Sequence, residues 1–356
     1  MTREANRRQF LSGEVFNTAP EPDEAPRKPP ASGDSVRLET RAMACTWSVI
    51  LNPGATEEVM TASSAFERVY ELDRRLTIFR DDSELNQLNR MAASGEWHPM
   101  SAEVFGLLEQ CAELYRGTNG CFDPVTRPLA ALWRTCRQNG RVPREEEITQ
   151  AKSWCGLEHV RFNRDELAIS FELKGTGTPP LEIGFDLGAI GKGYAIDVVA
   201  DELAKGGVDE YMVHGGYSSI RAQGGHNGAD GWSVGIKNPL FNSKRLATLV
   251  LSNQALSTSG SNVQFFRHEG QRYGHIIDPR TGYPCDELLS VTVVAPTAAE
   301  ADALSTAFYV MGLDNASSYC DDHPEIGAIL VPIPQGTRTL APVVRNIPET
   351  HLFFEP

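Results

Sequence analysis

The sequence has 356 residues, of which 41% are hydrophobic and 22% are charged, close to the average for globular proteins. A chain of this composition can bury a sizeable core, which excludes disorder throughout, and its length allows one large domain or two intimate lobes. The 47 acidic and 33 basic residues give a formal net charge of −14, so we expect no nucleic-acid partner. A small polyanion would need a local cation or helix N-terminal amides to bind.

The N-terminal residues and the cysteines bear on location. The segment Asn6-Arg7-Arg8-Gln9-Phe10-Leu11 is similar to a twin-arginine export signal, but the apolar stretch of roughly 7–15 residues that such a signal requires does not follow. Seven scattered cysteines without zinc-ligand spacing favour a reduced compartment. No apolar run approaches the ~18 residues of a membrane-spanning helix, so no transmembrane segment is expected. We therefore favour the cytoplasm, with export to the periplasm as the alternative.

The first part of the chain predicts a disordered tail followed by a folded domain. Pro, Ala, Glu and Asp dominate Thr18 to Asp34, so we expect disorder over residues 1–35 and one domain over residues 36–356. Alternation and helical spacing then predict a strand over Arg41–Leu51, a helix over Thr56–Leu72 and a helix from an N-cap at Ser101 to Tyr115.

The second part alternates short strands with two strong helices. The helices are expected over Gly191–Lys205 and over Thr297–Met311. The strands are expected over Leu167–Leu173, Leu181–Leu187, Tyr211–Val213, Ser218–Ala222, Trp232–Ile236, Ala247–Leu251, Arg272–Ile277 and Leu288–Ala295. Because the helices are not regularly interleaved with the strands, an α+β fold is predicted.

A carboxylate and a hydroxyl share one face of the last predicted helix. Asp302 and Thr306 are four positions apart in Glu300-Ala-Asp302-Ala-Leu-Ser-Thr306, which places them on one side of a helix. Oxygen ligands of this kind suit Mg2+, which keeps several waters and takes further ligands from a substrate phosphate. The alternative is a surface helix whose first-turn acids interact with the helix dipole.

A glycine-rich turn precedes the helix at Gly191. The sequence Glu182-Ile-Gly-Phe-Asp186-Leu-Gly188-Ala-Ile-Gly191-Lys192-Gly193-Tyr194 predicts a helix N-terminus whose amides, with Lys192, can hold a phosphate. It is not a Walker A loop and lacks the G-x-G-x-x-G order of a dinucleotide fold. The alternative is an ordinary strand-to-helix turn.

Two further motifs carry candidate chemistry. In Gly274-His275-Ile-Ile-Asp278-Pro-Arg280-Thr-Gly282, a histidine lies beside a predicted tight turn and is suited to act as a base, although a structural histidine is the alternative. In Gly120-Cys121-Phe122-Asp123-Pro124-Val-Thr126, the alternative is that Asp123 caps a helix with Pro124 in its first position.

Taken in order, five motifs resemble those of the ApbE family of FAD:protein FMN transferases. They are Ala42-Met43-Ala-Cys-Thr46, Phe122-Asp123-Pro124, Asp186-Leu-Gly-Ala189-Ile-Gly-Lys192-Gly-Tyr194, His275-Ile-Ile-Asp278-Pro-Arg-Thr-Gly282 and Ala301-Asp302-Ala-Leu-Ser-Thr306. The resemblance spans about Arg41 to Gly312. It implies a two-lobed, T-fold-like α+β architecture with a mixed or antiparallel sheet, packed helices, and FAD between the lobes.

The resemblance also implies residue roles. FAD is expected to contact Met43, Phe79, Cys121, Phe122, Asp123, Asp186, Lys192, Ile276 and Ile277. Mg2+ is expected to bind the Ala189 carbonyl, Asp302 and Thr306. His275, oriented by Asp278, is expected to assist transfer as a base. Phe79 stands where the family usually has a tyrosine, so stacking on the flavin is kept and the hydroxyl is lost.

The implied reaction is the Mg2+-dependent transfer of FMN from FAD to a Thr or Ser, with release of AMP. The implied acceptor is a flavoprotein subunit with a D-G-x-[ST]-G-A-[ST] motif. An FAD pyrophosphatase and a non-catalytic FAD carrier are the alternatives. From the sequence we expect Asp302→Ala to abolish transfer with little loss of folding.

Overall fold

The computed structural model describes residues 33–54, 56–175, 177, 179–180, 182–241, 243–260, 265–334 and 339–355. Most of the predicted disordered tail, residues 1–32, lies outside the described residues, so that prediction stays open, as does the division into a tail and one domain. The first strand begins at Val36, next to the predicted boundary. None of the helices in the described ranges has the length and apolar character that crossing a membrane requires.

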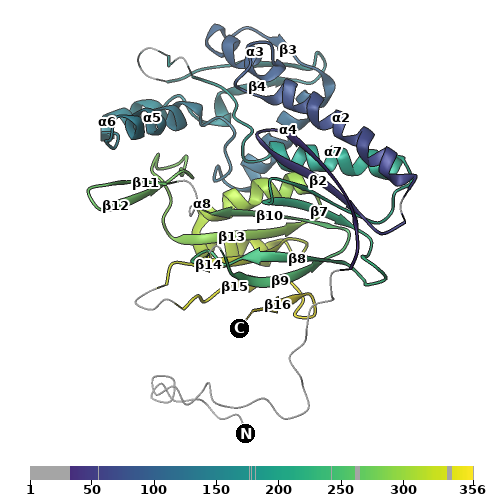
Figure 1. The fold of residues 1–356 in the computed structure, drawn as a ribbon. Helices are drawn as coiled ribbons and strands as arrows, with labels where there is room; N and C mark the ends of the chain where they lie inside the picture. Colours follow the sequence, from purple (N-terminus) through teal and green to yellow (C-terminus); the bar gives the residue numbers. More distant parts are fainter. Residues whose placement is uncertain are drawn as a thin grey trace, which may run out of the picture.

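An eight-stranded antiparallel sheet forms the centre of the fold (Figure 1). Its strands lie in the order β1 (Val36–Ala42), β2 (Cys45–Leu51), β6 (Tyr211–Gly215), β7 (Ser219–Gln223), β10 (Gln254–Gly260), β13 (Leu288–Ala295), β14 (Gly327–Pro332) and β15 (Val343–Arg345). Every residue of β13 is buried, as expected for a strand that is covered on both faces.

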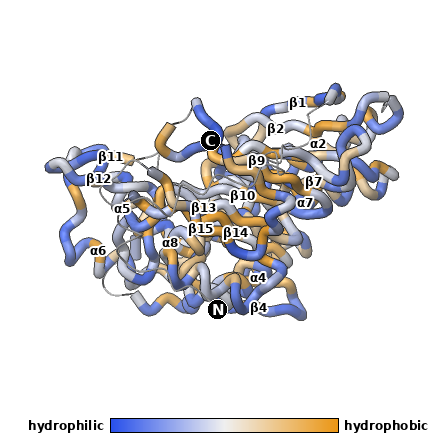
Figure 2. Tube along the Cα trace, turned by 90° about the horizontal axis from the view of Figure 1, so that it is seen from below, coloured by the Kyte–Doolittle hydropathy of each residue, from blue (hydrophilic) through white to orange (hydrophobic). Residues whose placement is uncertain are grey.

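Helices cover one face of this sheet, and a smaller sheet covers the other (Figure 1). The helices are α2 (Glu58–Leu76), α7 (Gly191–Lys205) and α8 (Ala298–Asp322). The smaller sheet has the order β16 (Leu352–Phe354), β9 (Arg245–Leu251) and β8 (Trp232–Lys237). Separate hydrophobic clusters fill the two interfaces. Hydrophobic colour in Figure 2 accordingly gathers on the central strands.

The remaining elements lie beyond α2 and α7 or beside the large sheet (Figure 1). The first group is α3 (Glu84–Met91), α4 (Ala102–Gly117) and a sheet of β3 (His98–Pro99), β5 (Ala168–Phe171) and β4 (Val160–Asn163), with short 3-10 turns at Ala92–Ser94 and Leu157–His159. The second group is α5 (Arg127–Gln138), α6 (Glu145–Lys152) and the hairpin of β11 (Phe265–His268) and β12 (Gln271–Gly274). Trp133 Nε1 donates to the Gly282 carbonyl at 2.8 Å and so ties α5 to the loop after β12.

The α+β architecture is confirmed, and several predicted elements are corrected. The helix over Gly191–Lys205 is confirmed, and Ser101 caps α4 as predicted. The single strand over Arg41–Leu51 is wrong: Met43 and Ala44 have φ values of 47° and 58°, which turn the chain into a hairpin. The strand predicted over Leu181–Leu187 is wrong, because no strand forms over the described residues 182–187. The last predicted helix is longer than expected: α8 continues beyond Met311, through Gly312 with its non-helical backbone, to Asp322.

Gly193 allows the first turns of α7 and α8 to lie in contact. A Cβ atom placed on Gly193 would lie 2.1 Å from the Ala298 carbonyl oxygen and 2.8 Å from the Ala299 nitrogen. Neither backbone atom can move without shifting α8. We expect Gly193→Ala to lower the free energy of unfolding by about 2 kcal/mol or more, as overpacked core sites do. Urea unfolding measures this, and Gly106→Ala in helix α4, where an added Cβ has open space, is the matched control.

Candidate functional site

A cavity of about 750 Å3 opens beside the first turns of α7 and α8 and the ends of β7 and β10. It brings together every predicted site residue except Met43, Phe79 and Asp278. The predicted residues that line it are Cys121, Phe122, Asp123, Asp186, Ala189, Lys192, His275, Ile276, Ile277, Asp302 and Thr306. Segments that are far apart in the sequence therefore meet in one place.

Asp302 is the buried anion of this cavity, with 5% of its surface exposed. Its Oδ1 accepts hydrogen bonds from the hydroxyls of Ser219 and Ser257, both at 2.9 Å. Its Oδ2 accepts from the Gly193 amide at 3.1 Å, and the Lys192 ammonium lies 3.4 Å away. These donors provide hydrogen-bond partners for both oxygens of the buried carboxylate.

Two capping interactions place α8 so that Asp302 faces the cavity. The Thr297 hydroxyl accepts from the Glu300 amide, and Asp197 on α7 accepts from the amides of Ala298 and Ala299 at 2.9 and 2.8 Å. Asp197 also pairs with Arg221 on β7. The Asp197 carboxylate on α7 thus fixes the first turn of α8. Thr306 follows Asp302 by one turn of α8 and also lines the cavity.

The glycine-rich turn differs from the expected amide cradle. The amides of Ile190 and Gly191 donate to the Leu187 carbonyl, and the Gly193 amide is used by Asp302. The helix start therefore offers a ligand few free amides, and Lys192 is the main positive group that it contributes to the cavity. The Ala189 carbonyl receives none of the hydrogen bonds formed among the described residues, so an acceptor oxygen remains on a residue that lines the same cavity as Asp302.

The loop after β12 places His275 and Asp278 differently. His275 lines the cavity, whereas the Asp278 carboxylate, 8% exposed, accepts two hydrogen bonds from the Arg280 guanidinium at 2.9 Å and one from the Arg280 amide at 2.8 Å. The bonds described for Asp278 thus hold the tight turn and Arg280. Direct orientation of His275 by Asp278 stays a prediction.

Asp123 lies in the cavity wall but does not cap a helix. Its Oδ1 accepts from the Val125 amide at 2.8 Å, and α5 begins only at Arg127, with Thr126 at the N-cap position. The capping alternative for Asp123 and Pro124 is therefore wrong. Burial raises the pKa of Asp123 to about 7, because the charged carboxylate is removed from water.

Two predicted contact residues lie away from the main cavity. Met43 is in the β1–β2 turn, where its amide donates to Asp73 at 3.0 Å. Phe79 is 84% exposed and borders a neighbouring cavity of about 320 Å3 together with Arg127 and Arg134. A third cavity of about 250 Å3 shares Arg134 with this one and His275 with the main cavity. The three cavities follow one another from Asp302 to Phe79.

The sequence interpretation missed residues that support Asp302. Ser257 lies in none of the predicted elements, and Ser219 lies on a predicted strand that carries no expected role. Asp197, which caps α8, was also unassigned. One signal was available: the run Leu256-Ser-Thr-Ser-Gly260 carries three consecutive hydroxyls, so that Ser257 and Ser259 share one face of a strand. Small hydroxyls on the helix-facing side of a buried strand indicate a polar partner on that helix.

Among the described residues, no three His, Cys, Asp or Glu side chains form a cluster that could hold a metal. All seven cysteines are free thiols. The ligands predicted for a metal in the main cavity, Asp302, Thr306 and the Ala189 carbonyl, are one carboxylate with neutral oxygens, which is a donor set typical of Mg2+ and not of zinc.

Comparisons with known proteins identify the family of the sequence. The sequence pattern described as the ApbE family matches residues 43–330. The FAD:protein FMN transferase of Salmonella typhimurium is 30% identical over 299 residues, which cover 83% of each chain. That of Klebsiella pneumoniae is 31% identical over 293 residues, or 81% of each chain.

Solved structures show the same fold. The ApbE protein of Thermotoga maritima superposes with a TM-score of 0.75 at 27% identity and covers 84% of this chain and 94% of its own. The flavin transferase ApbE of Vibrio cholerae superposes with a TM-score of 0.74 at 26% identity, covering 88% and 97%. The family match, the curated relatives and the shared fold lead to one conclusion: this chain belongs to the ApbE family.

Proposed function

We propose that this chain is an FAD:protein FMN transferase that moves the FMN half of FAD to a Thr or Ser of a target flavoprotein subunit and releases AMP. The observation that carries the proposal is the single cavity in which Asp302, Thr306, Lys192 and His275 meet. The names of the relatives, two of them aligned over more than 80% of this chain, support the same reaction. The acceptor is expected to carry a D-G-x-[ST]-G-A-[ST]-like motif.

The cavity fits a Mg2+ ion held by Asp302, Thr306 and the Ala189 carbonyl. The Lys192 ammonium lies 3.4 Å from Asp302 Oδ2, which supports a place for a cation beside this carboxylate. The Ala189 carbonyl is an acceptor without a hydrogen bond from the described residues. When bound, the ion would supply Lewis-acid polarisation of the pyrophosphate oxygens and offset their charge.

The protein groups then account for positioning and proton transfer. Lys192 attracts the pyrophosphate, and Phe122, Ile276 and Ile277 give the cavity an apolar wall against which the rest of FAD can lie. His275 takes the proton of the acceptor hydroxyl. The oxygen of that hydroxyl forms a bond to the phosphorus of the FMN half, the bond between this phosphorus and the bridging oxygen breaks, and AMP leaves with the electron pair.

One assay tests the proposal against its alternatives. The protein is incubated with FAD and MgCl2, with and without a peptide that carries the motif, while AMP release and the mass of the peptide are followed. We expect AMP release and addition of one FMN to the peptide, and loss of both with EDTA. AMP release without added mass would instead identify an FAD pyrophosphatase. Retention of FAD with neither product would identify a carrier.

The pKa of Asp123 predicts how FAD affinity depends on pH. FAD is an anion, so it binds best when Asp123 is protonated and neutral, and its binding raises the pKa of Asp123 further above 7. Affinity should therefore be highest below pH 7, and a shift of one pKa unit on binding implies a fall of about fivefold between pH 6 and 8.

The Kd of FAD, measured by flavin fluorescence at each pH, checks this dependence. In Asp123→Asn the slope should disappear, because the amide is neutral throughout. Equal pH dependence in the wild type and in Asp123→Asn would show that another group controls binding. Asp165→Asn, an exposed acid outside the cavities described, is the matched control.

A further inference from the structure

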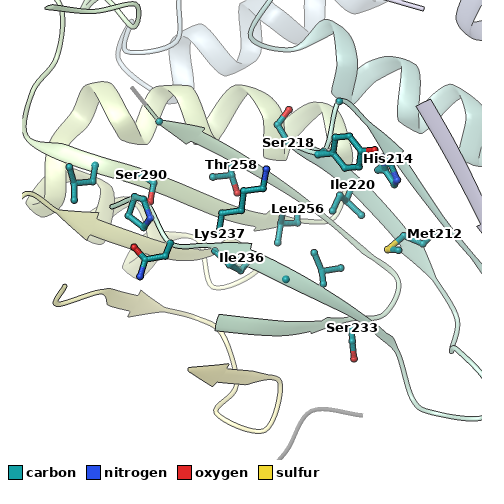
Figure 3. Close-up of a pocket in the computed structure, with 18 residues that line it drawn as sticks. Met212, His214, Ser218, Ile220, Ser233, Ile236, Lys237, Leu256, Thr258 and Ser290 are labelled. Atoms are coloured by element: carbon teal, nitrogen blue, oxygen red, sulfur yellow. The ribbon is translucent and has the colours of Figure 1, made fainter. Parts of the chain in front are cut away.

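A groove of about 430 Å3 lies between β8 and the face of the large sheet (Figure 3). Its floor is apolar and buried, formed by Ile220, Leu256 and Leu289 from the large sheet with Val234 and Ile236 from β8. Polar side chains line its rim: Ser218, Thr258, Ser290 and Lys237. Figure 3 shows Lys237 projecting from β8 toward the strand that carries Thr258.

The groove is continuous with the main cavity. The two share Gly216, Ser218, Thr258 and Gly260 as lining residues. A chain segment lying in the groove would therefore end beside the cavity that holds Asp302 and Lys192.

Strand β8 presents an open backbone edge to this groove. Among the described strands it pairs only with β9. On β9, the Val250 amide donates to the His351 carbonyl and so points toward β16. The N–H and C=O of the adjacent residue Leu249 therefore point the other way, toward β8, where Leu249 pairs with Val234. In an antiparallel ladder these directions alternate, so the N–H and C=O of Gly235 point to the opposite edge, which lines the groove. Such an edge can accept one more strand.

The dimensions of the groove match a short extended segment. It crosses the neighbouring strands β6, β7, β10 and β13, which at about 4.8 Å per strand gives roughly 14 Å. Its β8 side runs from Ser233 to Lys237, four steps of about 3.3 Å, or roughly 13 Å. Both lengths fit about four residues of extended chain.

The residues at the junction with the main cavity carry two unusual features. Tyr217, between the shared Gly216 and Ser218, is 62% exposed and has a φ of 61°, a strained conformation for an aromatic residue. It stacks on His214 with ring centroids 5.0 Å apart. His214 is buried and accepts from Arg37 at Nε2, and its Nδ1 forms no hydrogen bond within the described chain.

We infer that this groove binds the acceptor protein as an extended segment that pairs with the edge of β8 and delivers its Thr or Ser hydroxyl past Tyr217 into the main cavity. The inference rests on the proposed function and names the surface that the acceptor uses. A nucleotide is a poor occupant, because among the described residues that line the groove Lys237 is the only Lys, Arg, Asp or Glu. The same lysine complements an acidic side chain in the segment.

The test compares acceptor peptides with single backbone N-methyl groups, using the full chain, FAD and MgCl2. Edge pairing requires peptide N–H groups at alternate positions only, so we expect the KM for the peptide to rise at least tenfold at every second position and to change little between them. Tyr217→Ala should raise the same KM at least tenfold while the Kd of FAD stays unchanged. Tyr217→Phe should behave as the wild type, and Phe241→Ala, an exposed aromatic outside the groove, is the control.

The outcomes separate the two proposals. Transfer by the wild type with N-methyl effects that do not alternate, or with a Tyr217→Ala variant that keeps its peptide KM, overturns the groove and leaves the transferase proposal standing. A change in FAD affinity without a change in peptide KM also overturns the groove, because it identifies the occupant as the flavin. Absence of transfer to any peptide by the wild type overturns the proposed function and this inference together.

Discussion

Replacing Asp302 by asparagine should lower the rate of FMN transfer about a thousandfold while the protein stays folded. The asparagine oxygen can still accept from Ser219 and Ser257, which bond Oδ1 in the native chain, so that of these donors only the Gly193 amide loses its acceptor. The negative charge that would hold Mg2+ is lost. Loss of several kcal/mol of charge stabilisation corresponds to this fold-change. The rate of AMP release against MgCl2 concentration measures it, and the curve should move to much higher Mg2+.

We expect Asp302→Ala to lower the stability of the protein as well as its activity, whereas the sequence alone predicts little loss of folding. Asp302→Ala would leave the hydroxyls of Ser219 and Ser257 and the Gly193 amide without their acceptor. Each buried group left unsatisfied costs about 1–3 kcal/mol, so this variant should also unfold more easily. Asp314→Asn, an exposed acid on the same helix, is the control. A fully active Asp302→Asn protein with an unchanged Mg2+ requirement would refute the metal assignment.

Much of this site could be predicted because its parts are local in sequence. The one-turn spacing of Asp302 and Thr306 and the turn before Gly191 are read from short segments, and both lie in the predicted elements. The residues that support them are not local. Ser257 reaches Asp302 from another strand, and Asp197 caps a helix that begins a hundred residues later. Such contacts depend on the order of the strands in the sheet, which cannot be read from the residue pattern of a single sequence.

The irregular elements were missed for a different reason. Residues 182–187 contain an apolar alternation typical of a strand, yet Gly184 has a φ of 111° and the Asn89 side chain bonds the backbone of Phe185 in both directions. A side chain from α3 thus replaces a neighbouring strand as the hydrogen-bond partner. This irregular segment bears on the site because it leads into the turn that carries Asp186 and Ala189.

Replacing His275 by asparagine should lower the transfer rate by about 10²–10⁴, the usual contribution of a general base. His275 lines the main cavity and one neighbouring cavity, so it can reach both FAD and an acceptor. The Kd of FAD should change little, because the apolar wall and Lys192 remain. Single-turnover transfer to the peptide measures the chemical step, and His268→Asn on the adjacent hairpin is the matched control.

The pH profile separates a base from a structural histidine. A base is inactive once protonated, so the transfer rate of the wild type should fall toward acid pH; we call this fall the acid limb. The His275→Asn variant should have a lower rate and should also lack the acid limb. Arg280→Ala tests the neighbouring turn. If Asp278 acts by anchoring Arg280, as its two guanidinium bonds indicate, Asp278→Ala and Arg280→Ala should give equal rate losses, and the acid limb should persist in both. If Asp278 orients His275 directly, only Asp278→Ala should alter that limb.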